Sequence, residues 1–269
     1  MTVTEATVLE AVLRRDRWVV VAALVAVILV AWMWIVLGAG TGMNAVAMTQ
    51  MAGMPDMDMM MERAVWTPAY ATLIFAMWWV MMVAMMLPSA APILLIFSRV
   101  GRRERLARRP DVSIGVFAAG YLAVWAAFSA LAVLLQWWLE RSGLLSSMMS
   151  TTTAWLGAMI LIAAGLWQLT PIKHACLRQC RSPVSFLAAH WRPGNSGAFR
   201  MGLTHGAYCV GCCWFLMALL FFGGVMNLWW IGGLAAYVLI EKLLPIGPWL
   251  SYATGLVLIG SGVWLIFAT

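Results

Sequence analysis

The sequence predicts an all-α protein, a polytopic membrane bundle of about seven transmembrane helices with its N-terminus inside the cell. The composition is 64% hydrophobic and 10% charged, with a mean hydropathy of +0.91, which is typical of a chain whose main partner is a lipid bilayer. Apolar runs of about 20 residues, the length that crosses a bilayer core, recur between polar segments. We expect one membrane domain over residues 1–269.

The expected spans follow one another with short connections. In chain order they cover residues 18–37, 67–97, 112–139, 154–169, 201–222, 228–244 and 249–267. The second span contains Pro88 and Pro92, so it is long enough to be tilted or to be broken at the prolines. Two connections are longer and polar, a Met-rich loop at 38–66 and a basic, Cys-containing loop at 170–200.

The basic residues predict the orientation. With seven spans and an inner N-terminus, the inner side holds every Lys and Arg of the chain except Arg63 and Arg141. Inner loops of membrane proteins are enriched in Lys and Arg. The net charge of +7 is therefore explained by membrane topology, and we expect no nucleic-acid partner.

The fifth span carries the strongest chemical pattern. His205, Cys209, Cys212 and Cys213 follow at i, i+4, i+7 and i+8, so they share one face of a helix. An imidazole and three thiols on one stripe form a soft-metal site or a thiol redox site. The alternative is a packing face, because Gly202, Gly206 and Gly211 would let another helix approach closely.

Methionine marks the outer side and the second span. The outer loop contains Met43, Met48, Met51, Met54, Met57, Met59, Met60 and Met61, of which the last six are candidate metal ligands. Met77, Met81 and Met85 form a stripe at helical spacing in the second span, and Met82 and Met86 form a stripe beside it. Thioethers select Cu(I), whereas the alternatives are composition bias in a chain with 21 Met and ordinary packing.

The inner loop adds His174, Cys176 and Cys180. Their spacing is not that of a structural zinc site, and we expect the flanking Lys and Arg to lower the pKa of both thiols. All five Cys then lie at or near the reducing cytoplasmic side, and Met crowds the oxidising side. This segregation favours handling of Cu(I) over thiol–disulfide exchange.

Glu241 and Lys242 are the clear ionisable pair within the expected spans. Intramembrane charge is costly and typical of functional sites, so Glu241 could neutralise an inner basic residue or carry a proton. The alternative is an interfacial pair that reaches the inner surface. No phosphate loop, nucleotide motif or Ser/His/Asp pattern occurs, so an enzyme is the less favoured class.

Three motifs together resemble a bacterial family of predicted metal-binding integral membrane proteins. They are the stretch 79–90, which begins Trp79-Val80-Met81-Met82, the stretch 171–183 and the stretch 205–214 with Glu241-Lys242. The resemblance covers about 66–245 and implies a membrane location and metal binding. We expect the membrane to be the bacterial inner membrane.

These observations predict a multi-pass protein that binds Cu(I) in copper acquisition, delivery or tolerance. The outer Met loop would capture the ion, the Met stripe would offer a route, and the His and Cys residues would receive it. A copper chaperone or a copper enzyme is the expected protein partner. The alternatives are a membrane thiol–disulfide oxidoreductase and a haem-handling protein with His205 as an axial ligand.

Overall fold

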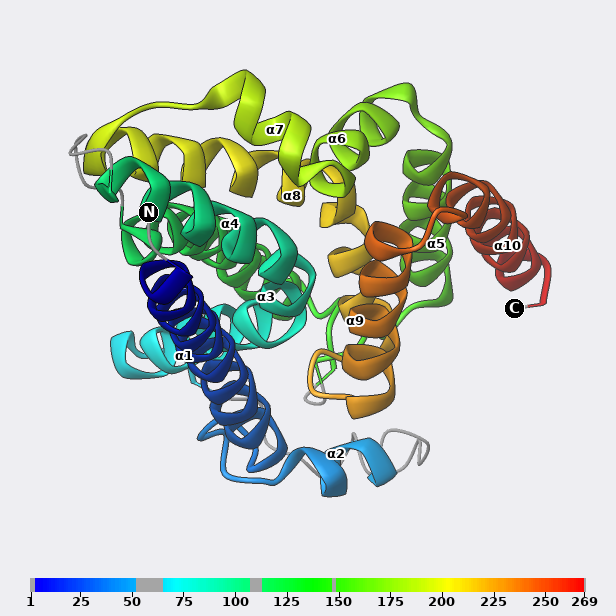
Figure 1. Cartoon of the computed structure of the whole chain (residues 1–269). Coiled ribbons are helices and arrows are strands. Elements are labelled where there is room, and N and C mark those ends of the chain that lie inside the picture. The colour runs from blue at the N-terminus through cyan, green and yellow to red at the C-terminus, as the bar shows by residue number, and fades with distance from the viewer. Residues whose placement is uncertain (1–2, 52–64, 107–112, 147–148, 269) are drawn as a thin grey trace.

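The computed structural model describes residues 3–51, 65–106, 113–146 and 149–268, and the described chain is all-α. Figure 1 shows the helices gathered side by side into one bundle. In chain order the helices are α1 (Val3–Val36), α2 (Ala45–Met51), α3 (Pro68–Leu106), α4 (Ile114–Arg141), α5 (Ala154–Leu169), α6 (Pro171–Arg181), α7 (Pro183–His190), α8 (Gly194–Gly223), α9 (Leu228–Leu243) and α10 (Gly247–Ala268).

Five of the described helices are long and apolar enough to cross a membrane. They contain the segments Trp18–Val36, Pro68–Gly101, Ile114–Arg141, Gly194–Gly223 and Gly247–Ala268. α5 and α9 have 16 residues each, about 24 Å at 1.5 Å per residue. α5 counts as a sixth span when it is joined to α6, from which it is bent by 66°.

The structure differs from the expectation in the connections. The segment 170–200 is not a loop: it forms α6 and α7 and the first residues of α8. α3 continues without a break through Pro88 and Pro92. Figure 1 shows α6 and α7 along one edge of the bundle and α2 at the opposite edge.

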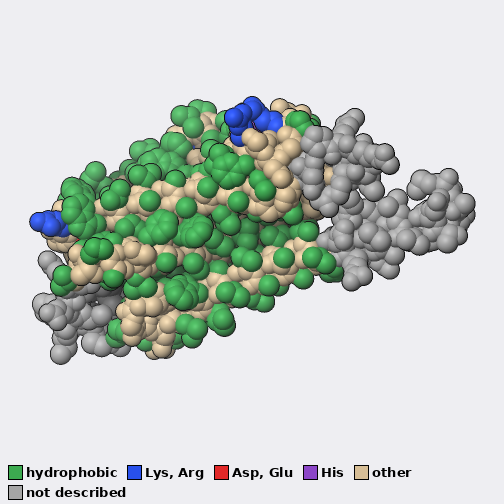
Figure 2. Space-filling view, turned by 90° about the vertical axis from the view of Figure 1, so that its left-hand side faces the viewer, with side chains coloured by type: hydrophobic (Ala, Val, Ile, Leu, Met, Phe, Trp, Pro, Cys, Tyr) green, Lys and Arg blue, Asp and Glu red, His purple; other side chains and the backbone are tan. Residues whose placement is uncertain are grey.

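The lateral surface is apolar. In Figure 2 hydrophobic side chains cover the visible face of the described chain, and the Lys and Arg side chains lie at its margins. α1 and α10 are the most peripheral spans, since only 11% and 17% of their most apolar windows are buried. A face of this kind is suited to contact with lipid tails.

Glycines set the closest helix contacts around α8. A Cβ atom at Gly202 would lie 2.1 Å from the carbonyl oxygen of Phe117 in α4, so only glycine permits this approach. The contact brings the His205 side of α8 against Tyr121, with 5.9 Å between the two ring centroids. The packing of α4 on α8 therefore positions the first part of the candidate site.

Candidate metal centre

The predicted His and Cys stripe of α8 faces the interior. His205 is 2% exposed, and the exposed fractions of Cys209, Cys212 and Cys213 are 1% or less. α8 begins at Gly194, earlier than predicted, so Cys209 lies about 22 Å along the helix. The thiols are thus near the middle of α8, deeper in the bundle than the predicted position at its inner end.

α6 brings the other two cysteines to the same place. A Cβ atom at Gly211 would lie 2.9 Å from the Cys176 sulfur, so the absence of a side chain at Gly211 lets α6 approach α8. The Cys180 thiol lies beside the thiols of Cys209 and Cys212 and interacts with both. The bend between α5 and α6 therefore gathers all five cysteines of the chain, which we call the thiol cluster.

Cys209 is the polar centre of the thiol cluster. The Lys242 ammonium donates a hydrogen bond to its sulfur over 3.0 Å and another to Ser89 Oγ over 3.1 Å. The Tyr121 hydroxyl lies 3.2 Å from the same sulfur and 3.2 Å from the Met86 carbonyl oxygen. Side chains from α4 and α9 thus converge on one thiol of α8, and both are held by atoms of α3.

The remaining sulfurs of α8 lie next to a thioether of α3. Cys212 and Cys213 both donate to the Cys209 carbonyl oxygen, over 3.1 and 3.0 Å, and Met86 Sδ lies 4.0 Å from Cys213 Sγ. All five cysteines are free of disulfides. The cluster therefore combines thiols with a thioether, the two side-chain sulfur groups that select Cu(I).

No three His, Cys, Asp or Glu side chains of the described ranges are arranged as a metal site. The thiols of Cys212 and Cys213 instead donate to the Cys209 carbonyl oxygen. Soft monovalent ions are satisfied by two or three sulfur ligands, which can include thioethers. Small rotations of the Cys209, Cys212 and Cys180 side chains would turn these sulfurs into ligands, since thiols lose their protons when they bind metal.

α6 lies outside the expected spans. Burial, and not the charge of the flanking basic residues, is the largest cause of the pKa shifts of Cys176 and His174 in this helix. Burial raises the pKa of the Cys176 thiol, and Cys212 raises it further, which contradicts the expected lowering. Burial, followed by the charge of Lys173, lowers the pKa of His174. The His174 ring packs on Tyr252 with 4.8 Å between centroids, so the structure places His174 against α10 rather than among the thiols.

His205 lies in an aromatic enclosure. Its ring centroid is 5.1 Å from that of Phe186, 5.9 Å from Tyr121 and 6.3 Å from Phe117. The buried Nδ1 atom has no hydrogen-bond partner. His205 is therefore next to the thiol cluster with one free ring nitrogen, which suits a minor ligand better than a central one.

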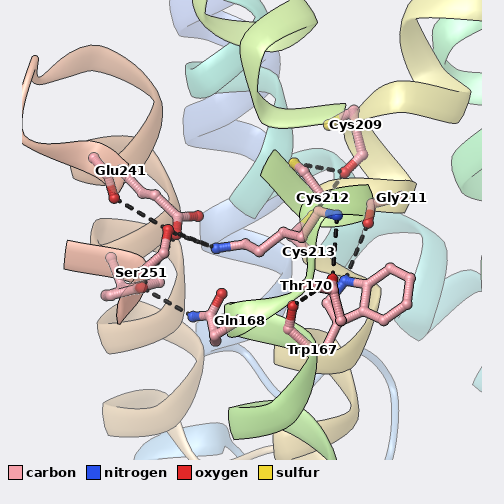
Figure 3. Close-up of polar contacts among 12 residues, drawn as sticks. Trp167, Gln168, Thr170, Cys209, Gly211, Cys212, Cys213, Glu241 and Ser251 are labelled. Carbon is pink, nitrogen blue, oxygen red and sulfur yellow. Dashed lines mark hydrogen bonds and ion pairs between the residues drawn. The ribbon is translucent and has the colours of Figure 1, made fainter. Parts of the chain in front are cut away.

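Glu241 and Lys242 are both buried, with exposed fractions of 0% and 4%, so the interfacial alternative is wrong. Glu241 Oε1 pairs with the Lys173 ammonium and accepts hydrogen bonds from Ser251 over 2.5 Å and Tyr237 over 3.2 Å. Figure 3 shows Glu241 and Ser251 on one side and the cysteines of α8 on the other. The adjacent charges of α9 thus belong to two different networks.

The predicted methionines fall into two groups. Met77, Met81 and Met85 are buried, with exposed fractions of 1% or less. The methionine that contacts the thiol cluster is Met86, which belongs to the neighbouring stripe. Met51 is partly buried at the end of α2, and Met48 is buried, so part of the Met-rich loop does fill a core. The candidate ligands Met54, Met57, Met59, Met60 and Met61 lie outside the described residues.

Lys242, Tyr121, Met86, Ser89 and Lys173 belong to these networks, although none of them is a candidate site residue in the sequence. A signal exists for two of them: Met86 lies in a methionine stripe at helical spacing, and Lys242 stands beside a glutamate in an apolar span. No sequence pattern singles out Tyr121 or Ser89. Their roles arise only from the contacts between α3, α4, α8 and α9.

Residues 75–265 match the model of PpoB2, a family described as a copper chaperone. No curated protein and no solved structure matches the chain. The matched residues include α4 to α9 and most of α3 and α10, together with all five cysteines of the thiol cluster. The chain therefore belongs to the PpoB2 copper chaperone family.

Proposed function

We propose that this protein is a multi-pass protein of the bacterial inner membrane that binds Cu(I) at the thiol cluster and delivers it to a copper enzyme or a second chaperone. The observation that carries the proposal is the convergence of all five cysteines around Cys209, with Met86 beside them. Thiolates and thioethers prefer Cu(I) to hard ions. Membership of a copper chaperone family supports the same ion.

Cys209, Cys212 and Cys180 are the proposed principal ligands, because their three thiols lie beside one another in the interior. Cys213 and Met86 form the side of the cluster that faces α3. Cys176 and His205 lie at the edge of the cluster, and we assign them accessory roles. His174 lies against Tyr252 of α10, outside the cluster. The burial of the cluster would protect the bound ion and the thiolates from water and oxidants.

The proposed route of the ion starts at the Met-rich loop. Met51, Met54, Met57, Met59, Met60 and Met61 would capture Cu(I) in an oxidising compartment, where thioethers persist. The buried methionines of α3 would carry it towards Met86 and Cys213. No nucleotide-binding motif occurs in the sequence, so we propose delivery rather than driven transport.

The burial of the thiols disfavours the oxidoreductase alternative. A thiol that exchanges disulfides has to reach the disulfide of its partner, whereas Cys209, Cys212 and Cys213 are at most 1% exposed. The aromatic rings around His205 disfavour the haem alternative, because they occupy the space beside the ring that a porphyrin would need.

Metal analysis tests the proposal. Protein purified under anaerobic, reducing conditions and titrated with Cu(I) against a competing chelator is expected to retain at least one Cu(I) per chain. The measurement is copper content after gel filtration, with protein alkylated at its thiols before titration as a control. Iron with a Soret absorbance would favour the haem alternative. A chain that retains no metal would favour the thiol–disulfide oxidoreductase.

Topology is expected to follow the seven-span arrangement. Reporter fusions in the turn at Gly143 should be active on the outer side, and fusions at Arg99 and at Gly194 on the cytoplasmic side, because positive-inside loops fix the orientation. Paired reporters that are active only outside or only inside measure this. An external Gly194 would place α6 and its cysteines on the oxidising side and contradict the proposed segregation.

A further inference from the structure

A buried cation lies within the proposed cation-binding cluster. Lys242 is 4% exposed, and its ammonium nitrogen is 3.0 Å from the sulfur of Cys209. A lysine ammonium has three donors and no lone pair, so it cannot act as a metal ligand. A positive charge beside a metal site lowers the affinity for every cation, and its presence there requires an explanation other than metal binding.

The charge of Lys242 is not cancelled by its neighbour in sequence. Glu241 Oε1 is taken up by Lys173, Ser251 and Tyr237. The second partner of Lys242 is the uncharged Ser89 hydroxyl, at 3.1 Å. The ammonium therefore directs its charge at the sulfurs of the thiol cluster.

We propose that Lys242 is a specificity-determining residue that makes the thiol cluster accept monovalent soft ions and reject divalent ones. This inference rests on the proposed function of the cluster. A fixed positive charge repels a divalent ion twice as strongly as a monovalent ion at the same position. For a separation of about 5 Å in a partly screened interior, one extra unit of charge changes the binding ratio on the order of a hundredfold.

Charge balance favours the same ions. Cu(I) needs only two thiolates, so when two of the three proposed ligands bind as thiolates and the third stays a protonated thiol, the ligands, Cu(I) and the Lys242 ammonium sum to zero. A divalent ion held by the same two thiolates leaves a net positive charge in a region of low dielectric constant. Ligand number adds to the effect. Divalent Zn²⁺ prefers four tetrahedral ligands. The Lys242 ammonium lies beside Cys209, where a further ligand would have to be, so it hinders four-coordinate binding.

The test compares Ag(I), a monovalent soft ion that does not change oxidation state, with Cd(II), a divalent soft ion. Affinities of the purified full-length protein are measured under reducing conditions for the wild type, Lys242→Met, Lys242→Gln and Lys242→Arg. The ratio of Ag(I) to Cd(II) affinity is expected to fall on the order of a hundredfold in the Met and Gln variants. It should remain within a few-fold of wild type in the Arg variant, which keeps the charge.

Lys242→Gln keeps a donor for Ser89 and guards against a folding defect of the Met variant. An unchanged affinity ratio in either neutral variant would overturn the inference while leaving Cu(I) binding intact. A second outcome would also overturn the inference, independently of the Lys242 variants. In that outcome wild-type protein shows Cd–thiolate absorbance, and the absorbance disappears when Cys209→Ser and Cys212→Ser are combined. A wild-type chain that binds neither Ag(I) nor Cu(I) would instead refute the proposed function itself.

Discussion

Replacing Cys209 and Cys212 by serine together is expected to abolish stable Cu(I) binding. A hydroxyl is a much harder ligand than a thiolate, and the two thiols both lie beside the thiol of Cys180. The loss of affinity should exceed the 10- to 100-fold that outer-shell changes typically cause. Copper retained per chain and affinity against a chelator measure the effect.

Graded single variants separate metal binding from packing. Cys176→Ser and His205→Ala are expected to lower the affinity less, because Cys176 lies at the edge of the cluster against Gly211 and His205 lies among aromatic rings. If α8 presents only a packing face, serine should leave the copper content unchanged, and the bulkier Cys209→Leu should disrupt the fold. Full copper occupancy in the double serine variant would refute the assignment of the site.

Glu241→Gln is expected to cause the largest loss of stability. The change leaves the Lys173 ammonium buried without its counter-charge, both side chains being fully buried, and breaking a buried ion pair typically costs about 3–5 kcal/mol. For a chain of this size the apparent midpoint of thermal unfolding in detergent should fall on the order of 10 °C. Unfolding monitored by light scattering or tryptophan fluorescence measures the shift.

The same variant should weaken Cu(I) binding indirectly. Lys173 is on α6 with Cys176 and Cys180, so its pairing with Glu241 of α9 holds these thiols over α8. Glu140→Gln is the matched control, because Glu140 is only partly buried and a glutamine keeps one of the two oxygens that accept from Trp66 and Gln136. Joint replacement Lys173→Met with Glu241→Leu should recover much of the stability, since it removes both charges. An unchanged unfolding midpoint in Glu241→Gln would contradict a structural role for the pair.

Local sequence patterns were enough to predict the all-α fold class and the bounds of most of the helices. Hydrophobic run lengths placed α1, α4, α5 and α9 within a few residues of their observed ends, apart from the polar start of α1. The helical spacing of His205, Cys209, Cys212 and Cys213 correctly predicted one shared face, because that spacing depends only on helix geometry. The polar segment 170–200 was harder, since short amphipathic helices resemble loops in composition.

The sequence by itself determined an all-α chain with apolar helices, a thiol face on α8 and a Met-rich α3, because these follow from composition and from the 3.6-residue period. Only the tertiary structure decided which groups meet. The bend after α5 and the missing side chain at Gly211 bring Cys180 and Cys176 to α8, and helix packing directs Lys242 to Cys209 and Glu241 to Lys173. Such contacts join residues far apart in the chain, and they depend on helix angles and close approach at glycines, which no local pattern encodes.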